Sequence, residues 1–324
     1  MVAAIKRART IACYVLLCAT AFAGVATRAE AQSRPTGSAR GVDRVPGDFA
    51  TLQQAVDLGR APIILVASGE YAGATIDRPI AIACRGQCMI TSGPAIGALQ
   101  AGFVLEGGAD GTLIHGFDFV DIDLGVFASC PTVGSTPDDV AIVRNAFVNT
   151  AQGVTVNATD CDGGAGWIVR RNRFHDLRSD TGDCGGGLGV YLIDVTGTEV
   201  SNNVFRGEIA APPCGPLFTT AGIYLSGSSN VRVTRNDFEL GDGGHAFKLD
   251  IALFADDGTN EDILVAFNDS RGSAAPFDGI HFLSVDGIDV RARCNSGTTV
   301  LEHTGSEGTS ERYTENGCRR VSSP

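Results

Sequence analysis

Lysine is almost absent from this chain, and basic residues as a whole are outnumbered by acidic ones. Of the 324 residues, 25 are Lys or Arg and 37 are Asp or Glu, which gives a net charge of −12. After residue 31 the one lysine is Lys248. A nucleic-acid partner needs a basic surface, so this balance argues against one. An acidic polymer would need a local basic patch or bridging cations to bind here.

Long apolar runs are missing after the first thirty residues, so no later segment is predicted to span a membrane. The N-terminus has a basic start at Lys6 and Arg7, an apolar run over about 11–25 and a small-x-small site ending at Ala31. These are the parts of an export signal, and the run is short for a membrane anchor. We therefore expect a signal peptide over 1–31, a secreted or periplasmic protein, and no membrane attachment after cleavage.

The rest of the chain has no obvious internal linker. Residues 32–47 are rich in Arg, Gly, Ser and Pro and predict a flexible leader. Residues 48–324 are then predicted to form one domain with one core, and we expect a monomer.

Helical periodicity is scarce, and a repeat of short strands takes its place. The repeat is an apolar strand followed by Asn, any residue and Phe, and its clear copies end at Phe147, Phe174, Phe205 and Phe238. The Asn positions are 145, 172, 203, 236, 268 and 295. Between them lie Gly-led strands such as G-V-T-V from Gly153, G-V-Y-L from Gly189 and G-I-Y-L from Gly222.

Repeats of this length with β-branched strands predict an all-β parallel solenoid, because stacked coils bury apolar sides that one coil cannot bury alone. The Asn positions should then form an amide ladder at a turn, with Asn in the left-handed conformation that it tolerates. The Phe positions should stack beside that ladder in the core. Residues 49–58 have helical spacing and are the expected cap over the N-terminal end.

The predicted cap helix, the I-I-L-V-A-S-G-E-Y segment at 63–71 and the Asn-x-Phe coils resemble the pectin-lyase-like superfamily of right-handed parallel β-helices. The resemblance covers about residues 48–300. It implies a right-handed parallel β-helix. It does not select an activity, since that superfamily contains lyases, hydrolases, epimerases and non-catalytic proteins.

The cysteines are interpreted against these coils. Ten are present, and removing two with the signal leaves eight, which suits disulfides in an oxidising compartment. Zinc is the alternative, but paired C-x-x-C spacing is lacking. The expected bridges are Cys130–Cys161 and Cys184–Cys214 between adjacent coils, then Cys84–Cys88 and Cys294–Cys318 by elimination.

Alternation along the Gly-led strands predicts which side chains point outward. We align A-F-K-L from Ala246 and G-I-H-F from Gly279 with the other Gly-led strands. The outward row then contains Phe127, Thr155, Tyr191, Tyr224, Lys248 and His281, and a second row contains Asn157, Ile193, Ser226, Asp250 and Leu283. Tyr191 and Tyr224 offer a platform for sugar rings, because tyrosine has an apolar face and a polar tip. Outward tyrosine is also common on sheets without any function.

Lys248, His281 and Tyr224 are the candidate catalytic residues. Lys248 adds a cation, and His281 titrates near neutrality. At one coil apart, a positive Lys248 would lower the pKa of His281 and keep it available as a base. Tyr191, Asp250 and His245 are the candidate substrate-binding residues, with Asp250 holding Lys248 in place.

In the superfamily, active sites commonly lie on the outer face of this kind of strand, between loops such as 175–188 and 206–221. The signatures of its known activities are absent: no arginine-rich motif, no spaced acid pairs and no D-P-H sequence. The acidic run at 256–262 is a candidate for calcium, but it lacks EF-hand spacing, and a solvated loop is the preferred interpretation. No metal or other cofactor is expected.

Two functions from different classes remain. The first is a carbohydrate-active enzyme, a polysaccharide lyase that abstracts the proton next to a uronic-acid carboxylate. The alternative is a non-catalytic protein: a carbohydrate-binding or surface protein that uses the same outward aromatic residues, or a purely structural exported solenoid. The sequence leaves open whether the protein is an enzyme. A polysaccharide is the expected partner both of a lyase and of a non-catalytic carbohydrate-binding protein.

Overall fold

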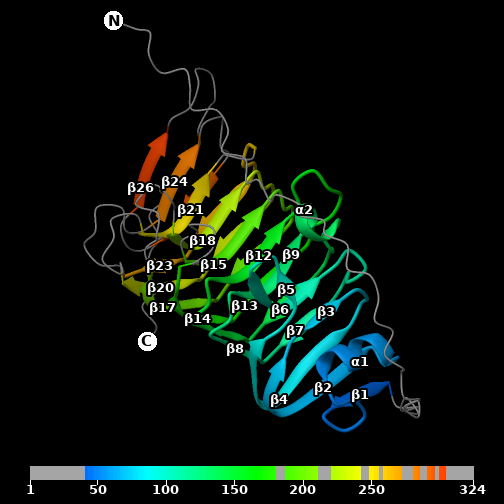
Figure 1. The fold of residues 1–324 in the computed structure, drawn as a ribbon. Coiled ribbons are helices and arrows are strands. Elements are labelled where there is room, and N and C mark those ends of the chain that lie inside the picture. The colour runs from blue at the N-terminus through cyan, green and yellow to red at the C-terminus, as the bar shows by residue number, and fades with distance from the viewer. Residues whose placement is uncertain are drawn as a thin grey trace, which may run out of the picture. The chain divides into compact units, whose positions relative to one another are not determined.

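In the computed structural model, the described residues are 41–179, 187–210, 220–241, 248–254, 258–271, 280–284, 290–295 and 299–303. All of them belong to one compact unit over residues 36–324. Their strands form a 16-stranded sheet, called sheet A, and a 10-stranded sheet, called sheet B (Figure 1).

Sheet B consists of β3 (Ala74–Ile76), β5 (Ala95–Ile96), β6 (Leu99–Leu105), β9 (Leu124–Ser129), β12 (Gln152–Asn157), β15 (Leu188–Ile193), β18 (Thr220–Ser226), β21 (Lys248–Phe254), β24 (Ile280–Ser284) and β26 (Thr299–His303). One half of sheet A consists of β1 (Val42–Val45), β2 (Ile63–Ala72), β4 (Ala81–Ser92), β7 (Leu113–His115), β10 (Ala141–Val143), β13 (Ile168–Arg170), β16 (Glu199–Ser201), β19 (Arg232–Thr234), β22 (Ile263–Ala266) and β25 (Val290–Arg293). The other half consists of β8 (Asp118–Val120), β11 (Ala146–Val148), β14 (Arg173–Leu177), β17 (Val204–Ile209), β20 (Asp237–Gly241) and β23 (Asp269–Ser270).

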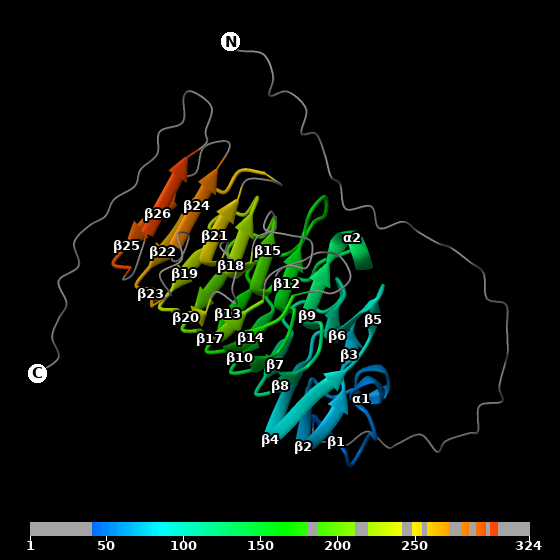
Figure 2. The ribbon, with the colours of Figure 1, turned by 60° about the vertical axis from the view of Figure 1, so that its left-hand side comes forward.

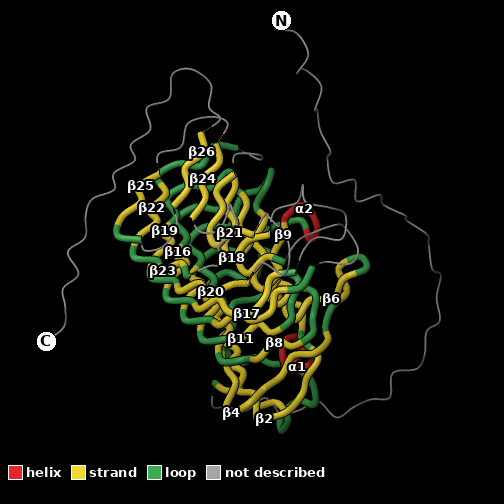
Figure 3. The backbone as a smooth tube through the Cα atoms, turned by 90° about the vertical axis from the view of Figure 1, so that its left-hand side faces the viewer, coloured by secondary structure: helices red, strands yellow, loops and turns green. Residues whose placement is uncertain are grey.

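From β7 to β24, each coil adds one strand to sheet B and one to each half of sheet A, and β4 joins the two halves. The coil-to-coil pairing is parallel; Phe147 pairs with Phe174, for example, and Phe174 with Phe205. Figure 2 shows the strands of sheet B side by side from β3 to β26, and Figure 3 shows the repeated turn of the backbone. The chain is therefore a right-handed parallel β-helix, the hand that parallel crossovers adopt almost without exception.

The N-terminal end contains helix α1 (Leu52–Leu58), which buries Leu52, Ala55 and Val56. The Thr51 side chain caps it by accepting the backbone N–H of Gln54 at 3.1 Å. Strand β1 pairs with β2 although it lies in the predicted leader over 32–47. The folded unit therefore includes Val42–Val45, and the predicted domain start at residue 48 is too late.

The Asn ladder is present and buried. From Asn172 to Asn295, each ladder Asn accepts, at its side-chain oxygen, the backbone N–H of the ladder Asn in the preceding coil. The distances are 2.9 Å from Asn145 to Asn172 and 3.0 Å from Asn203 to Asn236. The predicted position of the left-handed conformation is wrong by one residue. It belongs to the residue before each Asn, with φ of 57° at Arg144 and 59° at Arg171. The ladder Asn instead turns its amide inward, where it hydrogen bonds across coils.

The Phe ladder fills the core beside it, as predicted. Neighbouring rings from Phe119 through Phe238 are stacked with centroids 4.6–4.8 Å apart. A row of inward glycines in sheet B lies against these rings. A Cβ added to Gly189 would lie 2.6 Å from the Phe205 ring, so a larger residue does not fit beside phenylalanine. The glycine row and the Phe ladder are therefore complementary.

Candidate functional site

The candidate site is the outer face of sheet B. Its central outward row is set by strand register: Phe127 pairs with Thr155, Thr155 with Tyr191, and Tyr191 with Tyr224. This part of the predicted row is correct. The next positions are Ala252 and then His281. His281 is thus in the row of Tyr224, two coils away.

Lys248 is not in this row. It pairs with Thr220, and Tyr224 pairs with Ala252, four residues further along β21. At about 3.3 Å per residue, the backbone of Lys248 is ~13 Å from the position opposite Tyr224. The predicted alignment of Lys248 with Tyr224 and His281 is therefore wrong, and so is the predicted one-coil spacing of Lys248 and His281. The side chains of Lys248 and His281, and all of His245, lie outside the described residues.

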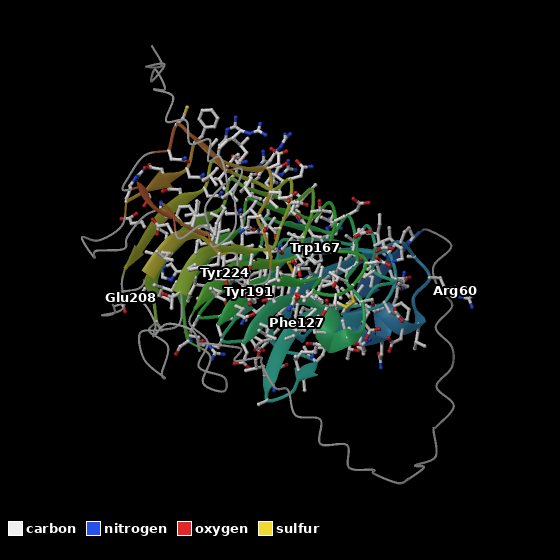
Figure 4. The ribbon with its side chains drawn as sticks, turned by 90° about the horizontal axis from the view of Figure 1, so that it is seen from above. Arg60, Phe127, Trp167, Tyr191, Glu208 and Tyr224 are labelled. Carbon is white, nitrogen blue, oxygen red and sulfur yellow. A yellow bond between two sulfur atoms is a disulfide. The ribbon has the colours of Figure 1, made fainter. Side chains whose placement is uncertain are left out.

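Three rings from consecutive coils form what we call the aromatic row: Tyr191, Tyr224 and Phe254. The ring centroids of Tyr191 and Tyr224 are 5.0 Å apart with an edge-to-face tilt of 60°. The rings of Tyr224 and Phe254 are 5.1 Å apart and stacked at 29°. Figure 4 shows the two tyrosines next to each other on the ribbon.

The aromatic row lies on an apolar surface. All three rings are partly buried and pack on Leu188, Ala221, Leu249 and Ala252, which are almost fully buried. An outward Lys248 in the predicted alignment implies an inward Leu249, but Leu249 belongs to this outer cluster. The surface therefore holds the rings in place from below, while each keeps part of its area in solvent.

Phe254 is a member that sequence reasoning missed. It pairs with Ser226, so it belongs to the second outward row beside Ile193. An alignment of Asp250, rather than Ala246, with the leading glycine would have placed Phe254 on the outer face. The predicted alignment used Ala246 because alanine resembles glycine in size and aspartate does not.

Asp250 points into the core and is 0% exposed. It lies between Leu249 and Ile251, which pair with Ala221 and Ile223, so it occupies the row of Gly222. Its Oδ2 accepts a hydrogen bond from the hydroxyl of Ser270, and Ser270 pairs with Phe238, the last ring of the Phe ladder. The predicted outward position of Asp250 beside Lys248 is therefore wrong.

Two predicted disulfides are present. Cys84–Cys88 and Cys130–Cys161 have Cα atoms 5.9 and 6.2 Å apart, within the ordinary range. Cys294 is also disulfide-bonded. Its expected partner Cys318 and the predicted pair Cys184–Cys214 lie outside the described residues.

The described part of the acidic run 256–262 is engaged within the protein. The Asn260 side chain accepts the backbone N–H of Ser228 and donates to the carbonyl of Phe254, and Asp262 pairs with Arg291. Among the described residues, no group of three or more His, Cys, Asp or Glu side chains is placed to hold a metal ion. Neither described helix has the length and apolarity to cross a membrane.

No family model matches the sequence, and no curated protein matches it either. Among solved structures, the DFA-IIIase of Arthrobacter chlorophenolicus in complex with DFA-III is 13% identical with a TM-score of 0.35, over 80% of this chain and 79% of its own. The A-module of the mannuronan C-5 epimerase of Azotobacter vinelandii is 12% identical with a TM-score of 0.31, over 87% and 98%. The surface protein and adhesin PfbA of Streptococcus pneumoniae is 10% identical with a TM-score of 0.33, over 80% and 92%. These TM-scores are too low to support conclusions about this chain. Its fold is assigned from its own strand pairing.

Proposed function

We propose that this protein is an exported carbohydrate-binding β-helix and that sugar rings bind on its aromatic row. The observation that carries the proposal is the contiguity of Tyr191, Tyr224 and Phe254, with ring centroids 5.0 and 5.1 Å apart over three consecutive coils. The basic and apolar N-terminal segment and the disulfides support export.

The physical reason is the match between aromatic rings and sugars. A sugar ring has an apolar C–H side that packs on an aromatic face, and the tyrosine hydroxyl adds a polar tip at the edge. Since parallel strands repeat at about 4.8 Å, a row with one ring per coil presents similar contacts at regular intervals. A ligand that repeats similar rings, an oligo- or polysaccharide, suits such a surface better than a single small molecule.

A panel of neutral and uronic-acid polysaccharides, tested by affinity electrophoresis and calorimetry, examines this proposal. Tyr191→Ala and Tyr224→Ala should each weaken binding of the retained polymer about tenfold, ~1.4 kcal/mol, within the range of aromatic contacts. The matched control is Phe267→Ala, an exposed aromatic residue in the turn between β22 and β23 of sheet A. Retention of no polymer, or equal losses in all three variants, contradicts the proposal.

A second candidate function is cleavage of a uronic-acid polymer by β-elimination. His281 favours it, because its backbone stays in the register row of Tyr224. His281 or Tyr224 would take the proton next to the carboxylate, the leaving-group oxygen would depart, and a carbon–carbon double bond would form. Lys248 remains a candidate to neutralise the carboxylate only from the far end of β21.

The test is the ultraviolet absorbance of unsaturated products from a panel of uronic-acid polymers. His281→Ala should lower the rate at least tenfold, and Lys248→Ala should have the smaller effect because of its distance from the row. Binding without any product leaves the aromatic row as a binding surface and rejects the lyase.

A further inference from the structure

A concave surface lies on sheet A, on the strands of the first coils. It is a groove of about 340 Å³ lined by Arg44, Val45, Pro46, Leu65, Val66, Ala67 and Arg85. These residues come from β1, the turn after it, β2 and β4, so the groove shares no strand with the aromatic row. Its volume is in the range of sites for small molecules.

Strand register places the two arginines on opposite sides of this groove. Arg44 pairs with Leu65 on β2, and Arg85 of β4 pairs with Ala67 on β2. Strands β1 and β4 are two strand spacings apart, or ~10 Å between backbones. Both arginines are exposed, and Leu65 and Ala67 lie between them. The groove therefore has a guanidinium on each side and an apolar floor.

The backbone that carries each arginine is held in place. Arg85 lies inside the short loop closed by the Cys84–Cys88 disulfide, and Cys88 is fully buried in the core. The backbone N–H of Arg44 donates to Asp48 Oδ2 at 3.0 Å, and its carbonyl accepts the N–H of Asp48 at 3.0 Å. Such anchoring lowers the entropy lost when a ligand orders the two side chains.

Neither guanidinium has a hydrogen-bond or ion-pair partner among the described residues. Other arginines do: Arg178 pairs with Asp123, and Arg206 pairs with Asp237. Asp48, on the turn after Arg44, accepts the backbone N–H described above. Both guanidinium groups beside this groove are therefore available to an acidic ligand.

We propose that this groove binds a small sugar acid. Its carboxylate would pair with Arg44 and Arg85, since a guanidinium presents a planar fork of donors that matches a carboxylate. Its apolar C–H side would lie on Leu65 and Ala67. This site is separate from the aromatic row and does not depend on the function proposed for that row.

Titration of the full-length mature protein with D-galacturonate and D-galactose tests the proposal, because the two sugars differ only at the carboxylate carbon. Galacturonate should bind saturably, and more weakly as salt is raised, while galactose should not bind. Arg44→Gln and Arg85→Gln should each weaken binding at least tenfold. Arg60→Gln, an exposed arginine outside the groove, is the matched control and should leave the affinity unchanged.

Three results overturn the proposal: no saturable binding of galacturonate, equal binding of galactose, or an equal loss in Arg60→Gln. Tyr224→Ala separates this site from the aromatic row, since it should leave galacturonate binding intact. If Tyr224→Ala abolishes that binding, the acid occupies the aromatic row and the groove is not its site. The double variant Cys84→Ser/Cys88→Ser should weaken binding because it frees the loop of Arg85, with circular dichroism confirming that the fold is retained.

Discussion

The outer face of sheet B has two halves that share one strand register and differ in what lies on them. Toward the N-terminus, Phe127 is only 7% exposed. It packs with Val104 and Leu124 under Ile96 of strand β5 and Val133 of helix α2 (Cys130–Val133). Toward the C-terminus, the same row contains Tyr191 and Tyr224, which keep part of their surface in solvent.

The difference shows that a shared register does not give a shared role. Phe127 has no polar group and is covered by a hairpin and a short helix from its own coils. The two tyrosines have a hydroxyl that suits the boundary between an apolar surface and water. We therefore interpret the N-terminal half as an accessory core, and the C-terminal half carries the proposed binding surface.

The largest expected effect is a difference in the free energy of unfolding between a variant in the accessory core and one in the aromatic row. Phe127→Ala should lower the free energy of unfolding by about 3–5 kcal/mol, because it removes a buried ring and leaves a cavity. Tyr224→Ala should cost less than half as much, since its ring is already partly in solvent. Denaturant unfolding of both variants measures this difference. Equal losses would mean that the two halves are equally buried.

The cover on the N-terminal half depends on the Cys130–Cys161 disulfide, which ties the start of α2 to the next coil. Removing it as Cys130→Ser/Cys161→Ser should destabilise the protein by about 3–4 kcal/mol, as expected for a crosslink with a sequence separation of 31 residues. Binding of an apolar dye should rise as Phe127 is uncovered, while sugar binding at the aromatic row should not change. A loss of sugar binding would show that the two halves are coupled.

The core beneath sheet B changes at β21. Under Tyr191 and Tyr224, as under the N-terminal half, inward glycine faces phenylalanine; one coil further on, Asp250 and Ser270 take those places. Asp250→Gly and Ser270→Phe should each destabilise by about 1–3 kcal/mol, through an unsatisfied hydroxyl in one variant and overpacking in the other. The double variant restores the glycine–phenylalanine pair and should recover at least 1 kcal/mol in a double-mutant cycle. Strictly additive losses would mean that the two positions do not interact.

The smallest expected effect concerns the hydroxyls of the aromatic row. Tyr191→Phe and Tyr224→Phe keep the rings and should change sugar affinity by less than about threefold, since a hydrogen bond at a surface that also binds water contributes at the low end of the net range of ~0.5–1.5 kcal/mol. Calorimetry with the polymer retained by the unsubstituted protein measures this. A tenfold loss would assign recognition to the hydroxyls rather than to the ring faces.

The repeat by itself determined most of the architecture. The ladder of Asn145, Asn172 and Asn203 could be predicted because each Asn serves the same turn in its own coil. The stacking of Phe147 on Phe174 and the Cys130–Cys161 bridge followed from the same coil alignment. Tyr191 beside Tyr224 was also predictable, because a leading glycine marks the register of both strands.

The tertiary structure alone decided the register of β21. The segment A-F-K-L-D-I-A-L alternates throughout, and a four-residue shift keeps the same parity, so the pattern cannot choose between the two alignments. The observed register requires Asp250 to lie in the core. The core tolerates this carboxyl group because Ser270 occupies the position of a ladder phenylalanine and donates a hydrogen bond to Asp250. That pairing moved Lys248 out of the row of Tyr224 and brought Phe254 into contact with it. The replacement of a glycine–phenylalanine pair by Asp250 and Ser270 involves two strands that meet only in the folded coil. Short-range patterns in the sequence therefore do not predict it.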